Sequence, residues 1–161
     1  LNISLNISLN INIYKYIYIN IMEKSTTLLC YDNIINIFLQ GNILNIDLMG
    51  SLTDKIMDDI CIKLDLFFNI CKKKNKKYYQ IFNLSKYDLL CTPNILYYIN
   101  NIVALLKKNK EFMKEFLHGS IIITESKYSK SFVDLILVNY TPSRPFKFIT
   151  TKDTIDFNFE E

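Results

Sequence analysis

Few side chains in this 161-residue chain have the type and spacing that catalysis requires. The single histidine, His118, follows a run with helical spacing, where we expect it to end a helix together with Gly119. Asp58 and Asp59 are adjacent, so on a helix they point about 100° apart and cannot serve one bond. The Gly-x-Ser-x-Gly elbow, the His-Glu-x-x-His pair and the glycine-rich phosphate loop are all absent from the sequence. We therefore expect no enzyme and no cofactor.

The cysteines show neither C-x-x-C spacing nor a neighbouring histidine, which argues against a zinc site or a redox dithiol. We expect buried free thiols in a reducing compartment. Cys91 allows an alternative, because it stands between a predicted strand and a predicted helix start, a position that can activate a thiol. A cysteine-dependent enzyme is the least favoured hypothesis, since no base stands near it. The four cysteines are Cys30, Cys61, Cys71 and Cys91.

The stretch IFNLSKYDLLCTPNILYYINNI, residues 81–102, places a polar loop between a buried strand and a helix. Such strand ends often carry function in sheets with helical connections. Thr92 is a natural N-cap and Pro93 suits the first helical position. A plain cap is the simpler role for Thr92, and a phosphorylation switch is the alternative. The candidate residues for partner docking or a switch are Ser85, Lys86, Thr92 and Asn94.

A basic cluster at residues 72–77, KKKNKK, precedes Tyr78 and Tyr79. Lysines beside aromatic rings could hold phosphates and stack on bases. However, a predicted helix ends at this cluster, where lysines complement the helix dipole. With a formal net charge of only +3, we expect no specific nucleic-acid binding.

Hydrophobic spacing predicts a single α/β domain over residues 22–161. Two alternating runs around Gly41, residues 35–39 and 44–48, predict a hairpin. A helix capped by Thr53 or Ser51 follows, and then a strand whose crossover connection implies a parallel neighbour. The predicted order is β-β-α-β-α-β-α-β-α. The later elements are a strand over 78–84, a helix over 92–117, a strand over 120–124, a helix over 130–140, a strand over 146–149 and a terminal helix with Ile155 and Phe159.

Residues 1–21 repeat the units LNIS, LNIS and LNIN, which we interpret as a low-complexity extension. Met22 opens a polar stretch that resembles a natural start, so the preceding segment could be untranslated sequence. An extra strand and a secretory signal are the alternatives, but Asn interrupts the apolar run too often for a signal. No window has the ~18 uncharged apolar residues of a membrane span. We expect a cytoplasmic protein from an A+T-rich genome, such as that of a virus or a protist.

The hairpin followed by strand-helix units, with a polar Asn-Leu-Ser ending the third strand, resembles the STAS domain over about residues 33–161. That family includes bacterial anti-sigma-factor antagonists and the cytoplasmic tails of sulphate transporters. The similar stretches are ILNIDLMGSLTDKIMDDI, YYQIFNLSKY and RPFKFITTKDTIDF. The resemblance implies a mixed, mainly parallel sheet with flanking helices.

Phosphorylatable members of that family carry an Asp-Ser-Ser-Gly type motif in the loop after the third strand. This chain has residues 91–94, CTPN, at the matching place, and Asn83 where an Asp is usual. The resemblance implies a non-enzymatic module that binds an unidentified protein partner through residues 85–94. A second hypothesis is a carrier of a lipid or small apolar ligand, since long Ile- and Phe-rich helices beside a sheet could open a groove.

Overall fold

The computed structural model describes residues 25–87 and 94–159. Its described residues form an α/β fold with one six-stranded mixed sheet, which confirms the general α/β class expected from the sequence. The strands are β1 (Thr26–Tyr31), β2 (Ile35–Gln40), β3 (Ile43–Leu48), β4 (Tyr78–Asn83), β5 (Leu117–Ile123) and β6 (Phe146–Ile149). The helices are α2 (Asp54–Lys74), α3 (Ile95–Lys108), α4 (Lys110–Phe116) and α5 (Lys127–Asn139).

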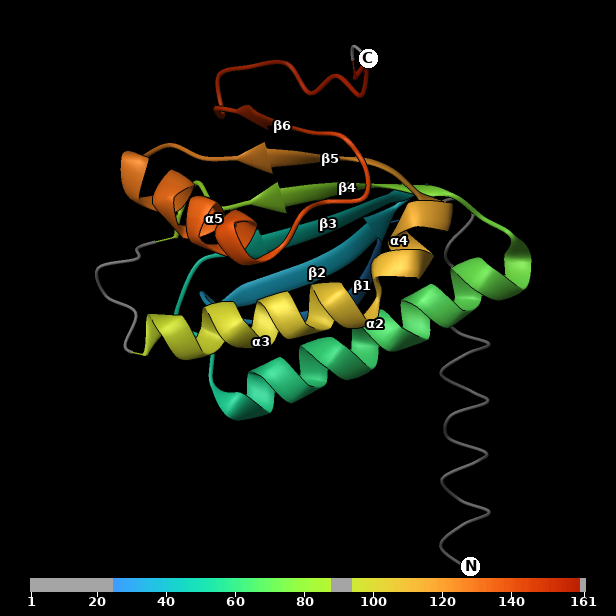
Figure 1. Ribbon diagram of the computed structural model, residues 1–161, viewed down its shortest axis with the longest axis horizontal. Coiled ribbons are helices and arrows are strands. Elements are labelled where there is room, and N and C mark those ends of the chain that lie inside the picture. Colours follow the sequence, from blue (N-terminus) through green and yellow to red (C-terminus); the bar gives the residue numbers. More distant parts are fainter. Residues whose placement is uncertain (1–24, 88–93, 160–161) are drawn as a thin grey trace, which may run out of the picture.

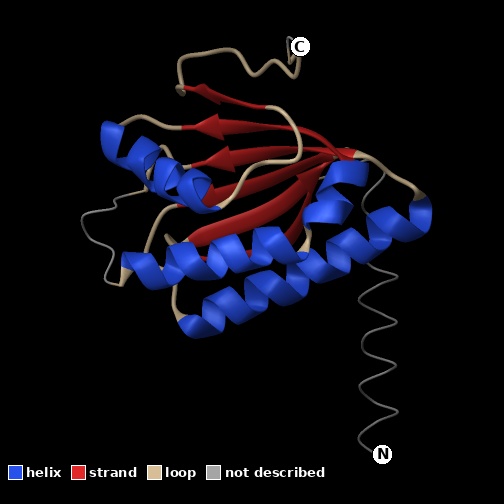
Figure 2. Cartoon of the chain, viewed as in Figure 1, coloured by secondary structure: helices blue, strands red, loops and turns tan. Residues whose placement is uncertain are grey.

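The six strands lie in the sheet in the same order as in the chain. β1, β2 and β3 form an antiparallel meander, and β3, β4, β5 and β6 are parallel. Each crossover advances one strand in the same direction, so connections of the usual right hand place all the helices on one face. Figures 1 and 2 show the helices gathered on that face.

The main hydrophobic core lies between this face and the helices, where period-two alternation turns one side of each strand inward. In the sheet, Ile37 and Leu44 are 0% and 1% exposed. On α5, Phe132 is 0% exposed. Thr53 begins α2, its hydroxyl accepting from the Ile56 amide at 3.3 Å. Thr53 is therefore the residue that caps this helix, one of the two predicted.

Strand β1 was not among the predicted elements. Its side chains do not alternate cleanly, because a bulge between Thr27 and Leu29 shifts the pairing with β2. A register shift of this kind breaks the period-two signal by which a strand is recognised. The sheet therefore has one more antiparallel edge strand than the sequence predicts.

The long predicted helix over 92–117 is wrong in its extent. α3 ends at Lys108 and α4 begins at Lys110, with Asn109 between them. The Asn109 side chain donates to the Leu105 carbonyl at 3.0 Å, a local bond that competes with helical continuation. β5 then begins at Leu117, so His118 and Gly119 lie in a strand rather than ending a helix.

A bulge at His118 and Gly119 explains why the sequence did not predict that β5 begins at Leu117. Tyr78 pairs with Leu117 and Gln80 pairs with Ser120, which leaves both residues opposite Tyr79. The imidazole of His118 stacks on the Tyr79 ring with centroids 4.9 Å apart. The extra residue interrupts the alternation, and the helical spacing just before it extends the predicted helix too far.

The predicted terminal helix is also wrong, because residues 154–159 contain no helix. This tail crosses the face of the sheet opposite the helices, where Phe157 contacts Tyr79 at 4.5 Å between ring centroids. Phe157 and Phe159 are half-buried, whereas the residues on either side of Phe157 are exposed. Inward positions two residues apart indicate extended chain. The tail covers a second apolar cluster made by Ile81, Ile121 and Ile123.

Candidate functional site

The loop after β4 holds two of the residues singled out from the sequence. The Ser85 amide donates to the Asn83 side-chain oxygen at 3.1 Å, so Asn83 supports the turn that leaves the strand. Ser85 is half-buried and Lys86 is exposed. Tyr87 is buried beside Phe132, with ring centroids 5.1 Å apart, and anchors the loop to α5.

The predicted helix start is wrong in register. α3 begins at Ile95, and its N-cap position is held by Asn94, which has a left-handed φ of 55° and makes no side-chain capping bond. The described start of α3 therefore differs from the predicted one, which had Thr92 as the N-cap and Pro93 as the first helical residue. Thr92 itself lies outside the described residues, as does Cys91, so the switch and the cysteine-enzyme hypotheses stay predictions.

The first turn of α3 exposes two large apolar side chains. Leu96 is 65% exposed and Tyr97 is 47% exposed. Tyr128 in the first turn of α5 is 44% exposed. The carboxyl ends of the parallel strands feed both helix starts, so these side chains lie at the same edge of the sheet as Lys86.

The described cysteines match the sequence expectation only in part. Cys71 is buried, and burial raises the pKa of its thiol to about 12, so it stays protonated. Cys61 is half-buried and Cys30 is exposed. The expectation of a buried thiol is therefore wrong for Cys30, which lies on the edge strand β1.

The tyrosines after the basic cluster face opposite sides of the sheet. Tyr78 is 1% exposed and packs edge-on against Phe67, with centroids 5.1 Å apart. The Tyr79 ring is covered by His118 and Phe157. α2 ends at Lys74 inside the cluster, with Asn75 in the left-handed conformation. The lysines therefore complement a helix end, and the Tyr78 ring is not available to stack on a base.

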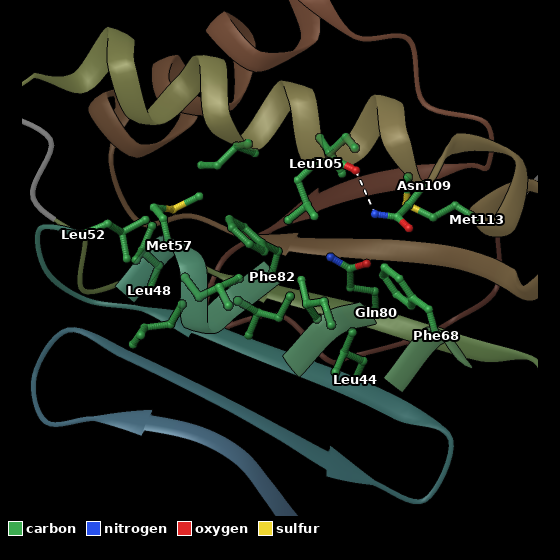
Figure 3. Close-up of a pocket in the computed structure, with 16 residues that line it drawn as sticks. Leu44, Leu48, Leu52, Met57, Phe68, Gln80, Phe82, Leu105, Asn109 and Met113 are labelled. Atoms are coloured by element: carbon green, nitrogen blue, oxygen red, sulfur yellow. Dashed lines mark hydrogen bonds between the residues drawn. The ribbon is translucent and has the colours of Figure 1, made fainter. Parts of the chain in front are cut away.

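Two adjoining cavities lie between the sheet and the helices. The first has a volume of about 80 Å³ and is lined by β3, β4 and the inner sides of α2, α3 and α4 (Figure 3). The second has a volume of about 130 Å³ and lies between β4, β5, α3, α5 and the loop before β6. The residues common to both linings are Gln80, Phe82, Ile102, Leu106 and Met113.

Two polar side chains form part of the floor of the second cavity. Gln80 on β4 and Ser120 on β5 are register partners in the parallel pair, and both face the helices. Within the described residues, neither side chain has a hydrogen-bond partner. Figure 3 shows the Gln80 amide pointing from the sheet toward the helices, on the side where Asn109 lies.

Sequence reasoning missed Gln80, although a signal was present. In the strand YYQIFN, period-two alternation places Gln80 on the same face as Tyr78 and Phe82, between two apolar core positions. A polar residue at an inward position of a strand needs a partner or a function.

Among the described helices, none combines the length and the apolar character needed to cross a membrane. Comparison with protein-family models, with curated proteins and with solved structures found no match for this chain. The function must therefore be argued from the geometry.

Proposed function

We propose that this protein binds a small apolar molecule in the paired cavities between its sheet and its helices. The observation that carries the proposal is the pair of adjoining cavities, whose walls are almost entirely aliphatic and aromatic. An apolar cavity of roughly 150 Å³ stays dry and takes up a benzene-sized molecule. The second cavity is close to that size, and the first extends it along the sheet.

Binding in such a site is driven by the removal of the ligand's apolar surface from water. Among the lining residues, Ile102 and Leu106 are half-buried rather than fully enclosed. Contact of a ligand with these side chains would fill space that the protein leaves empty, which supports a role as a carrier or sensor of the ligand.

Replacing Ile102 by phenylalanine should fill the junction of the cavities and weaken ligand binding at least tenfold. Ile102 contributes to both linings, and the larger ring would occupy the space that the ligand needs. Isothermal titration calorimetry with ethylbenzene, together with thermal unfolding in its presence and absence, measures the effect. Leu96→Phe is the matched control, since Leu96 is on the same helix and is 65% exposed. Equal binding by both variants would contradict the proposal, as would mass spectrometry and calorimetry that find no apolar ligand for the wild-type protein.

A STAS-like partner-binding module is the second candidate, favoured by the exposed Leu96 and Tyr97 at the same edge of the sheet as Lys86. Apolar side chains exposed together are typical of interaction sites. An antiparallel opening followed by parallel strand-helix units supports this candidate. The cavities favour the ligand hypothesis over it, because they supply a partly open apolar volume between the sheet and the helices, whereas this edge supplies only a few exposed side chains.

The partner hypothesis predicts that Leu96→Ser combined with Tyr97→Ser abolishes capture of a stoichiometric partner from a lysate of the source organism. Loss of the two apolar contacts would remove most of the exposed apolar area at this helix start. Val138→Ser is the control, because Val138 is 80% exposed but lies at the C-terminal end of α5, away from the helix starts. Retention of the partner by the double variant would exclude this edge as the docking surface.

A further inference from the structure

We infer that the ligand is an apolar molecule with one neutral oxygen group, a hydroxyl or a carbonyl, which hydrogen-bonds to Gln80 and Ser120. The inference rests on the proposed function and names the class of ligand. It follows from three features of the cavities: a pair of polar side chains without partners, the lack of charge around them, and the apolar walls on both sides.

The polar pair is built into the sheet rather than attached to its surface. Gln80 and Ser120 face each other across neighbouring parallel strands, so their separation is fixed by the register of β4 and β5. The next positions in this register row are Leu44 on β3 and Phe146 on β6, both apolar. The two polar groups thus form an isolated island in an otherwise hydrophobic row.

Within the described residues, neither of these side chains hydrogen-bonds to another protein group. A glutamine amide offers two donors and an acceptor, and a serine hydroxyl offers a donor and an acceptor. Both side chains are half-buried and face the second cavity, so water can satisfy them when no ligand is bound. A ligand oxygen placed at this island would accept from the Gln80 amide and from the Ser120 hydroxyl, and so would replace that water.

The charge around the island favours a neutral ligand over an acid. Among the described lining residues, Arg144 is the one with a formal charge, and it is exposed at the rim of the second cavity. Its guanidinium donates to the Lys114 carbonyl, so part of its hydrogen-bonding capacity is already used within the protein. A carboxylate bound among these apolar walls would lose much of its hydration, and that loss is large.

The walls determine where the rest of the molecule lies. From Gln80 the first cavity runs along Leu48, Leu52 and Met57, with no formal charge among its lining residues. Figure 3 shows these side chains on the opposite side of Phe82 from Asn109. An oxygen bound at Gln80 therefore directs a short apolar tail along this cavity.

Three probes of matched shape test the inference: ethylbenzene, 2-phenylethanol and phenylacetate. We expect Gln80→Met to weaken 2-phenylethanol binding by about threefold to tenfold, the equivalent of one hydrogen bond, without weakening ethylbenzene. Ser120→Ala should act in the same direction. Gln40→Met is the control, because Gln40 is exposed at the end of β2 and the substitution is identical. Wild-type protein should bind phenylacetate at least tenfold more weakly than 2-phenylethanol at pH 7.

The outcomes separate the inference from the function on which it rests. If Gln80→Met changes the affinities of ethylbenzene and 2-phenylethanol by the same factor, or if phenylacetate binds best, the neutral-oxygen inference is overturned while a ligand cavity stands. If none of the three probes binds to wild-type protein, the proposed function and the inference both fail. Thermal unfolding of each variant without ligand checks that the fold is kept.

Discussion

Replacing Phe132 by alanine is expected to lower the free energy of unfolding by about 3–5 kcal/mol, the usual range for a fully buried phenylalanine. Phe132 is 0% exposed and holds α5 against the sheet and against Tyr87 in the loop after β4. Its neighbours on α5, Val133 and Ile136, already line a cavity, so the void left by the ring adjoins existing empty space. Urea denaturation followed by circular dichroism measures the loss.

The control for Phe132 is a leucine on the same helix. Leu135 is 40% exposed, and Leu135→Ala should change the free energy of unfolding by less than about 1 kcal/mol. A loss below about 1 kcal/mol for Phe132→Ala would mean that α5 does not pack on the sheet as described. The same variant should also loosen the loop carrying Ser85 and Lys86, since Tyr87 loses the ring against which it packs.

The elements that the sequence predicted well are those whose signal is local. The hairpin of β2 and β3 follows from alternation on both sides of Gly41, which has a φ of 62°. The start of α2 follows from one hydroxyl, Thr53, and its end from lysines and Asn75. In each case a few neighbouring residues decide the conformation, so no knowledge of the tertiary structure is needed.

The elements that it predicted wrongly depend on distant contacts. Gly119 lies where the Phe159 ring covers β5, and a Cβ at this position would collide with that ring. The residues near Gly119 in the sequence give no sign of its contact with Phe159, which lies forty positions later. The position of the tail likewise depends on Tyr79 and on the cluster of isoleucines beneath it. Helical spacing alone therefore favoured helices at both places.

The candidate site divides in the same manner. The sequence identified the loop after β4 because polar residues follow a buried strand, and Ser85 and Lys86 are found there. It could not reveal the cavities, since empty space arises from the fit between elements rather than from any one of them. Gln80 lies between these cases: its inward direction could be predicted from alternation, but its lack of a partner could not.

Removing the rings of both Phe157 and Phe159 is expected to lower the free energy of unfolding by about 2–4 kcal/mol. The tail is the described cover for Ile81, Ile121 and Ile123 on the face without helices. It is tied down by few polar contacts, among them the Lys147 ammonium, which donates to the Asn158 carbonyl at 3.1 Å and lies 5.5 Å from the Phe159 ring centre. Apolar burial therefore supplies most of the attachment, and losing it should release the whole segment.

The double variant Phe157→Ala with Phe159→Ala is best compared with Ile155→Ala, because Ile155 is on the same tail and is 47% exposed. Urea denaturation should show a large loss for the first and almost none for the second. The isoleucines that the tail no longer covers should also bind 8-anilinonaphthalene-1-sulfonate, a dye that fluoresces on exposed apolar surface. Unchanged stability with no gain in dye binding would mean that the tail does not cover the sheet. A fall in stability without dye binding would mean that Ile81, Ile121 and Ile123 do not stay accessible once the two rings are removed, so that the strands carrying them rearrange.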